Sequence, residues 1–269
     1  MLTISGLQIE QYMAIFMFAS MRVFGLFLTT PLFAFRALPM QFRLLVAISF
    51  AAYMMPVISS ELIPNPGSIT FFASVIELCI GAFMGFVIRV GFTVIDIAAE
   101  VLSFQAGFSF ASTAFRDPAL DSGLVSQFLG LIVIALAFSL NIHLVLLEII
   151  LSSFKTIPVG VWPDAWNSKG VLELVAASFR LGLILSMPVL LVYMMFNLTQ
   201  AFLGRTSPQM NLFSVGFAVS IPLAFLVIFM ILPDLKFVLE RSLENPLQLI
   251  RQGVETPSAC LLYTSPSPR

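Results

Sequence analysis

Six apolar stretches constrain the fold of this 269-residue chain more than any other feature of its sequence. Each approaches the roughly 20 residues that an α-helix needs to cross the hydrocarbon core of a bilayer. Proline-containing segments separate the stretches, which cover residues 11–32, 42–58, 69–95, 124–151, 171–203 and 210–232. The sequence therefore predicts an all-α integral membrane protein of about six long hydrophobic helices. Their unequal lengths favour tilted or partly extramembrane helices.

The composition excludes several classes of protein. Only 10% of the residues are charged, against roughly 25% in a typical soluble domain, so a soluble globule could not cover its apolar surface. Lys and Arg number 13 and Asp and Glu 14, which leaves no basic field to attract nucleic acid. Cys79 and Cys260 are too few for a disulfide framework or a zinc site. Because no nucleotide motif or nucleophile–base pair is visible, we expect no enzymatic activity, cofactor or metal.

The two ends of the chain and the charges of its loops indicate less about its fold and orientation than the apolar stretches do. The N-terminus lacks the basic region and cleavage site of a secretory signal, so we expect the first stretch to be a permanent span. Residues 258–269 are rich in Ser and Pro and resemble a cloning-derived tail. Loop Lys and Arg number four on one side and five on the other, which does not set the orientation.

Several ionisable groups lie inside apolar stretches, where lipid exposure costs at least about 2.5 kcal/mol each. These groups are Arg22, Glu77, Arg89, Asp96, Glu148, Glu173 and Arg180. Arg89, Asp96 and Glu100 share one helical face, at i, i+7 and i+11. A proton or ion relay is one interpretation; neutralisation between helices, or exposure beyond the bilayer, is favoured because relays are scarce. For His143, near Asn141, a buried hydrogen-bonded role is favoured over metal binding, since no HExxH motif is present.

The segment from Phe104 to Asp121, FQAGFSFASTAFRDPALD, alternates large aromatic residues with Gly, Ala and Ser. An apolar helix is expected to end here, before a proline turn and a new helix. Irregular backbone at membrane depth is tolerated only where it is buried in protein or lines a cavity. A loop with these aromatics could therefore seal a pore by excluding water. An ordinary surface loop with its aromatics in the interfacial belt is equally consistent with the sequence.

Three blocks of sequence resemble the FliR/SctT family of type III export-gate proteins, most closely on its flagellar side. The matching residues are, in the first block, Gln105, Gly107, Phe110, Ala111, Asp117 and Pro118; in the second, Asn141, His143, Leu144, Ser153, Phe154, Ile157, Pro158 and Gly160; and in the third, Arg205, Pro208, Gln209, Met210, Phe213, Gly216 and Phe217. The chain departs from the family pattern at Ser207 and Ala218. The resemblance covers roughly residues 12–246.

The resemblance implies a non-enzymatic subunit that assembles with FliP, FliQ and FlhB into a helical cone in the bacterial inner membrane, within the flagellar basal body. Unfolded flagellar substrates would pass through this export gate. Residues 1–170 would then be FliP-like, and residues 171–246 would form a FliQ-like helical hairpin with the C-terminal end.

The same resemblance implies roles for two short segments. The plug would contain Phe104, Phe108, Phe110 and Phe115, with Gly107 as its hinge and with Asp117 and Pro118 ending the loop. The tip of the hairpin, which includes Arg205, Ser207, Pro208 and Gln209, would face FlhB.

A secondary transporter for a small solute is the alternative, because the face with Arg89, Asp96 and Glu100 could serve one. Such a transporter should show inverted repeats and broken helices at the midplane. No repeat is evident, although Pro188 and Pro222 could break their helices.

Overall fold

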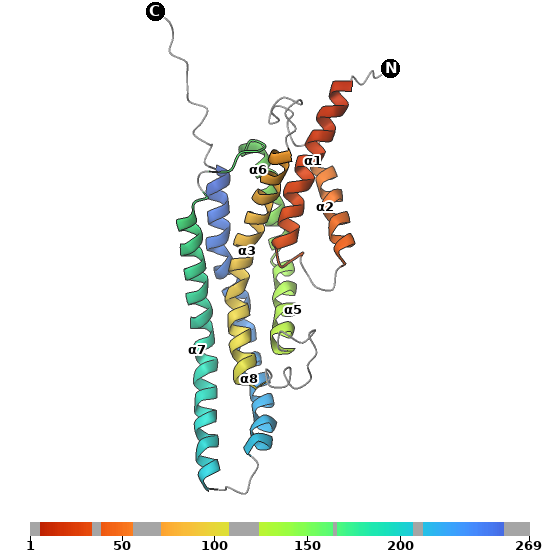
Figure 1. Cartoon of the computed structure of the whole chain (residues 1–269). Helices are drawn as coiled ribbons and strands as arrows, with labels where there is room; N and C mark the ends of the chain where they lie inside the picture. Colours follow the sequence, from red (N-terminus) through yellow and green to blue (C-terminus); the bar gives the residue numbers. More distant parts are fainter. Residues whose placement is uncertain are drawn as a thin grey trace, which may run out of the picture. The chain divides into compact units, whose positions relative to one another are not determined.

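The computed structural model describes residues 6–33, 39–55, 71–107, 124–163, 166–206 and 212–255. All regular structure in these ranges is α-helical, which confirms the predicted all-α class (Figure 1). The described helices are α1 (Gly6–Thr29), α2 (Met40–Met54), α3 (Phe71–Gln105), α5 (Leu124–Ser139), α6 (Ile142–Thr156), α7 (Ser168–Thr206) and α8 (Leu212–Glu255).

Four of the described helices, α1, α3, α7 and α8, are long and apolar enough to cross a membrane. Helix α2 is apolar but has only 15 residues, fewer than the roughly 17 that a span needs. The length and apolarity of α1, α3, α7 and α8 indicate a membrane-embedded protein.

The predicted stretch at residues 124–151 is not one helix. It forms α5 and α6, which meet at a bend of 63°. Asn141 lies at the break with a φ of 56°, in the left-handed region that Asn tolerates better than most residues. Its carbonyl oxygen accepts hydrogen bonds from the N–H groups of Leu144 and Val145 and so begins α6. Apolarity alone did not reveal this break, because the residues on both sides of it are mostly apolar.

Two helices run past the apolar stretches from which they were predicted. Helix α3 continues from residue 95 to Gln105, and α8 continues from residue 232 to Glu255. Pro233 does not end α8, and the residues after it include exposed charges at Asp234 and Lys236. Hydropathy marks the part of a helix that suits lipid, whereas the helix itself ends only where its backbone hydrogen bonds end.

The chain divides into two compact units. The first unit contains α1, α2, α3 as far as Arg89, α6 with the segment after it, and the end of α8. Helices α1 and α3 approach closely at small residues: a Cβ on Gly81 would collide with the Arg22 backbone, and one on Gly25 with the backbone of Leu78. Close backbone approach at small residues is the usual way in which helices associate in membranes.

The second unit contains α3 from Val90, α5, α7 from Leu174 and α8 as far as Glu244. Within it α7 and α8 run antiparallel as a hairpin (Figure 1). The buried Tyr193 of α7 donates a 3.0 Å hydrogen bond from its hydroxyl to the Ser220 carbonyl oxygen of α8. Gly182 lets α7 approach α3, because a Cβ there would lie only 3.0 Å from the Val94 carbonyl oxygen.

Candidate functional site

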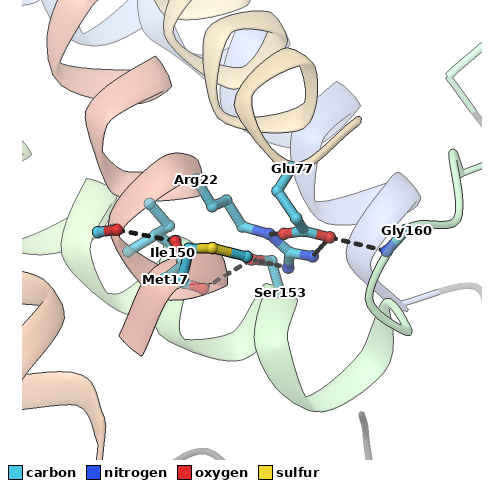
Figure 2. A network of polar contacts seen from close by, with 7 residues as sticks. Met17, Arg22, Glu77, Ile150, Ser153 and Gly160 are labelled. Atoms are coloured by element: carbon cyan, nitrogen blue, oxygen red, sulfur yellow. Dashed lines mark hydrogen bonds and ion pairs between the residues drawn. The ribbon is translucent and has the colours of Figure 1, made fainter. Parts of the chain in front are cut away.

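The best-defined polar site in the described residues is a buried ion pair in the first unit (Figure 2). Arg22, in the C-terminal half of α1, and Glu77, in the second turn of α3, both have fully buried side chains. The Arg22 Nε donates to Glu77 Oε2 at 2.6 Å and its Nη2 donates to Oε1 at 3.0 Å. This two-pronged geometry is the strongest that an arginine and a carboxylate can adopt.

Two further groups complete the hydrogen bonding of the pair. The third guanidinium nitrogen, Nη1, donates to Ser153 Oγ in the last turns of α6 at 3.0 Å. The Gly160 N–H donates to Glu77 Oε1 at 3.0 Å. Gly160 has a φ of 79°, a left-handed conformation that a side chain would strain, and it turns the chain after α6 so that its N–H meets the carboxylate. Figure 2 shows these groups converging from α1, α3, α6 and the turn.

An aromatic ring closes the site on one side. The Arg22 guanidinium carbon lies 4.1 Å from the centroid of the buried Phe154 ring. A cation over an aromatic face within this distance is attracted by the ring quadrupole. Each nitrogen of the Arg22 guanidinium and each oxygen of the Glu77 carboxylate therefore has a hydrogen-bond partner within the protein, which helps to make a fully buried ion pair tolerable.

This arrangement is suited to holding helices in register. Its four hydrogen bonds join α1, α3, α6 and the turn at Gly160. Arg22, Glu77, Ser153, Phe154 and Gly160 form a group that we call the clasp, in which the charges of Arg22 and Glu77 lie in direct contact between α1 and α3.

The other predicted polar residues lie elsewhere. Arg89, Asp96 and Glu100 are all exposed on α3 in the isolated chain. Glu100 accepts a 2.6 Å hydrogen bond from Ser126 Oγ, which ties α3 to α5. Asn141 is the exposed residue at the bend before α6, and His143 is half-buried in the first turn of α6. Within the described residues, no three His, Cys, Asp or Glu side chains are grouped to hold a metal.

The structure describes only the start of the predicted plug. Phe104, in the last turn of α3, exposes 68% of its surface. The Gly107 N–H donates to the Phe104 carbonyl oxygen, and Gly107 takes a φ of 81° where the helix has ended. This left-handed glycine is a common way to end a helix and redirect the chain. The remaining plug residues, Phe108, Phe110, Phe115, Asp117 and Pro118, lie outside the described residues.

The predicted hairpin tip is described only on its α7 side. Arg205 is exposed in the last turn of α7. Ser207, Pro208 and Gln209 lie outside the described residues.

Sequence reasoning singled out Arg22 and Glu77 but did not find their partners. Ser153, Phe154 and Gly160 belong to the second family-like block, S-F-x-x-I-P-x-G, which was recognised as a motif without a role. The spacing of that block was the available signal: it places a hydroxyl, a ring and a left-handed glycine within eight residues.

A family model for bacterial export proteins, family 1, matches residues 13–245 of this chain and so includes the whole clasp. The chain belongs to this family. Its relatives include the flagellar biosynthetic protein FliR of Escherichia coli K12, 26% identical over 238 residues that cover 87% of this chain and 90% of the relative. The flagellar biosynthetic protein FliR of Bacillus subtilis 168 is 27% identical over 87% of this chain and 95% of its own length. That of Buchnera aphidicola subsp. Acyrthosiphon pisum is 25% identical over 91% and 95%. The predicted resemblance to the FliR/SctT family is thereby confirmed.

Proposed function

We propose that this chain is a non-enzymatic subunit of the flagellar protein export gate, which forms and gates a channel for unfolded flagellar substrates across the bacterial inner membrane. The observation that carries the proposal is the export-family match over residues 13–245, together with relatives named flagellar biosynthetic protein FliR over most of their length. Four described helices able to span a membrane support a membrane location, and the flagellar names of the relatives lead us to propose the inner membrane at the flagellar basal body.

The surface of the hairpin supports assembly with partners. Large apolar side chains are exposed along both of its helices, among them Phe179 and Leu191 on α7 and Phe225 and Phe229 on α8. An exposed apolar surface of this extent must be covered by lipid or by protein. We assign part of it to FliP and FliQ, with residues 1–170 as the FliP-like part and residues 171–246 as the FliQ-like hairpin.

Native mass spectrometry after co-expression tests the subunit proposal. The full chain is produced with FliP and FliQ of the same organism and extracted in mild detergent. We expect a defined hetero-oligomer that contains this chain. A homogeneous monomer or dimer that ignores both partners would contradict the proposal and favour the transporter alternative.

The start of the plug segment supports a gating role. Phe104 points a large apolar surface outward at the end of α3, and Gly107 ends the helix in a conformation that redirects the chain. From there Phe108, Phe110 and Phe115 would close the channel, and Asp117 with Pro118 would begin the next helix. Rings interleaved with small residues suit a seal that must deform around a passing chain and close again.

Ion leakage through the assembled gate tests the plug. Residues 108–118 are replaced by a Gly/Ser linker of equal length, and conductance is measured in bilayers or in cells. Leakage should rise, because small polar residues cannot exclude water from a constriction. A matching replacement of residues 60–67, between α2 and α3, serves as the control and should leave leakage unchanged. If an assembled gate with the altered plug leaks no more than its parent, the plug role is refuted.

The hairpin tip is proposed to contact FlhB through Arg205, Ser207, Pro208 and Gln209. A photoreactive residue at Arg205 should crosslink to FlhB in the assembled gate. The same residue at Lys169, at the other end of α7, is the matched control. Equal crosslinking from both positions would argue against a specific contact at the tip.

A further inference from the structure

An apolar crevice opens in the second unit between α3, α7 and α8, with a volume of about 170 Å³. Its walls include Val94 of α3, Leu181 and Ile184 of α7, and Phe237 and Val238 of α8. Leu185 lines both this crevice and a smaller one of about 20 Å³, whose lining is entirely apolar and includes Ile95 and Ile231. The apolar lining thus continues along α3 beyond the main crevice.

The lining becomes polar only where α8 reaches Arg241 and Ser242. Ser242 is buried, and its hydroxyl already donates to the Leu239 carbonyl oxygen at 2.9 Å. Arg241 is exposed and pairs with no carboxylate in the described part of the chain. Glu240 and Glu244 flank it along α8, but neither lines the crevice. Among the lining residues, Arg241 therefore supplies an uncompensated positive charge at the edge of an apolar space.

This combination fits an amphipathic anion. An apolar cavity of about 150 Å³ is large enough to take up benzene, so this crevice can accept a segment of hydrocarbon. A guanidinium donates two parallel hydrogen bonds to a phosphate, which makes arginine well suited to binding one. Arg241 also follows the apolar run that ends near Leu232, beside the exposed Phe237. Charged and aromatic residues take this position where a membrane helix reaches the headgroup level.

We propose that the crevice binds an anionic phospholipid, with one acyl chain between α3, α7 and α8 and the phosphate on Arg241. Two separate features of the molecule carry the assignment. The apolar lining selects a hydrocarbon chain, and the single unpaired arginine selects an anionic headgroup. A lipid held here would fill a gap between helices that protein side chains leave open.

Native mass spectrometry of the full chain with added lipids tests the proposal. Phosphatidylglycerol and phosphatidylcholine with identical acyl chains are titrated separately, so that only the headgroup differs. The parent chain should retain phosphatidylglycerol preferentially. Arg241→Gln should weaken that binding about tenfold and remove most of the preference, because one charge-assisted contact is worth roughly that factor. Val238→Trp, which fills the crevice, should reduce binding of both lipids.

Lys236→Gln is the matched control, since Lys236 is an exposed cation on the same helix that does not line the crevice. Its preference for phosphatidylglycerol should equal that of the parent. For the isolated chain, three outcomes would overturn the proposal: no headgroup preference in the parent, an equal loss in both charge variants, or unchanged binding in Val238→Trp. The same lipids are also counted in a complex of this chain with FliP and FliQ. If Val238→Trp removes no lipid from that complex, a partner side chain occupies the crevice and the proposal fails.

Discussion

Removing the Glu77 carboxylate while Arg22 remains should destabilise the chain more than removing both charges. In Glu77→Leu the buried guanidinium loses two of its three hydrogen bonds and its counter-ion. The Gly160 N–H also loses its acceptor. In the double variant Arg22→Met with Glu77→Leu no buried charge remains, and Ser153 still donates its hydroxyl to the Ile150 carbonyl oxygen.

The magnitudes follow from what each variant leaves unpaired. Breaking a buried pair by removing one partner costs roughly 3–5 kcal/mol, whereas replacing both partners by apolar residues is often close to neutral. The unpaired Gly160 N–H adds a cost of roughly 1–3 kcal/mol to both variants. Glu77→Leu should therefore lower the melting temperature by about 10 °C or more. The double variant should recover at least about half of that loss.

Thermal unfolding of the full chain in mild detergent provides the assay. The chain has two tryptophans, Trp162 and Trp166, and both contact Phe83 in the unit that contains the clasp. Their fluorescence therefore reports on that unit. Glu148→Leu, which removes an exposed carboxylate from α6, is the matched control and should change stability by less than about 0.5 kcal/mol.

Two outcomes of this assay would contradict the idea that the Arg22–Glu77 pair stabilises the packing of the helices. If Glu77→Leu and Glu148→Leu melt at the same temperature, the buried pair does not hold the helices. Arg22→Met alone is measured as well. If the loss of stability in the double variant equals the sum of the losses in Glu77→Leu and Arg22→Met, the two charges do not interact in the folded chain.

Three further substitutions test other contacts by thermal unfolding, which is followed by tryptophan fluorescence for the first unit and by helical circular dichroism for the second unit, where Gly130 and Tyr193 lie. Gly81→Ala should lower the free energy of unfolding by about 1–3 kcal/mol, because its Cβ would collide with the α1 backbone. Gly130→Ala, which has open space around it, is the control and should not lower it. Equal effects of the two variants would contradict close packing of α1 and α3. Gly160→Ala should lose about 1–2 kcal/mol, because its φ of 79° disfavours a side chain, and an unchanged melting temperature would show that the turn relaxes freely. Tyr193→Phe should lose about 1 kcal/mol through its hydrogen bond to Ser220, and a variant as stable as its parent would mean that this bond adds nothing.

The helices could be predicted from the sequence where a local property decided them. Long apolar runs bounded by Pro or Gly located α1, α2 and α7 to within a few residues, since the requirement for a span is a property of one segment. The bend at Asn141 could not be predicted, because it depends on the left-handed conformation of one residue within a mostly apolar stretch. The length of α8 was likewise hidden, since Asp234 and Lys236 interrupt apolarity without interrupting backbone hydrogen bonds.

The clasp shows what remains out of reach for such reasoning. Arg22 and Glu77 could be recognised singly, since each is costly inside an apolar helix. Their pairing joins residues 55 positions apart, and the bond to Ser153 joins residues 131 positions apart. Contacts at that separation depend on which helices pack together, and a single sequence, taken without an alignment of its relatives, carries no direct signal for that choice.

The placement of charge distinguishes α1, whose arginine is paired within the chain, from α7 and α8, which expose most of their apolar surface. In α1, half of the 18 residues of the apolar segment Tyr12–Thr29 are buried inside the chain, and Arg22 is paired with Glu77 there. In α7 and in α8, only 22% of the residues of a comparable 18-residue apolar segment are buried. Arg180, Arg205 and Arg241 on these two helices are exposed, next to large apolar side chains. Exposed apolar surface with arginines that pair with no carboxylate of the described residues is suited to lipid headgroups and to acidic groups of other subunits. Substitutions in the clasp should therefore act on the stability of the isolated chain, whereas substitutions on the outer faces of α7 and α8 should act on what the chain binds.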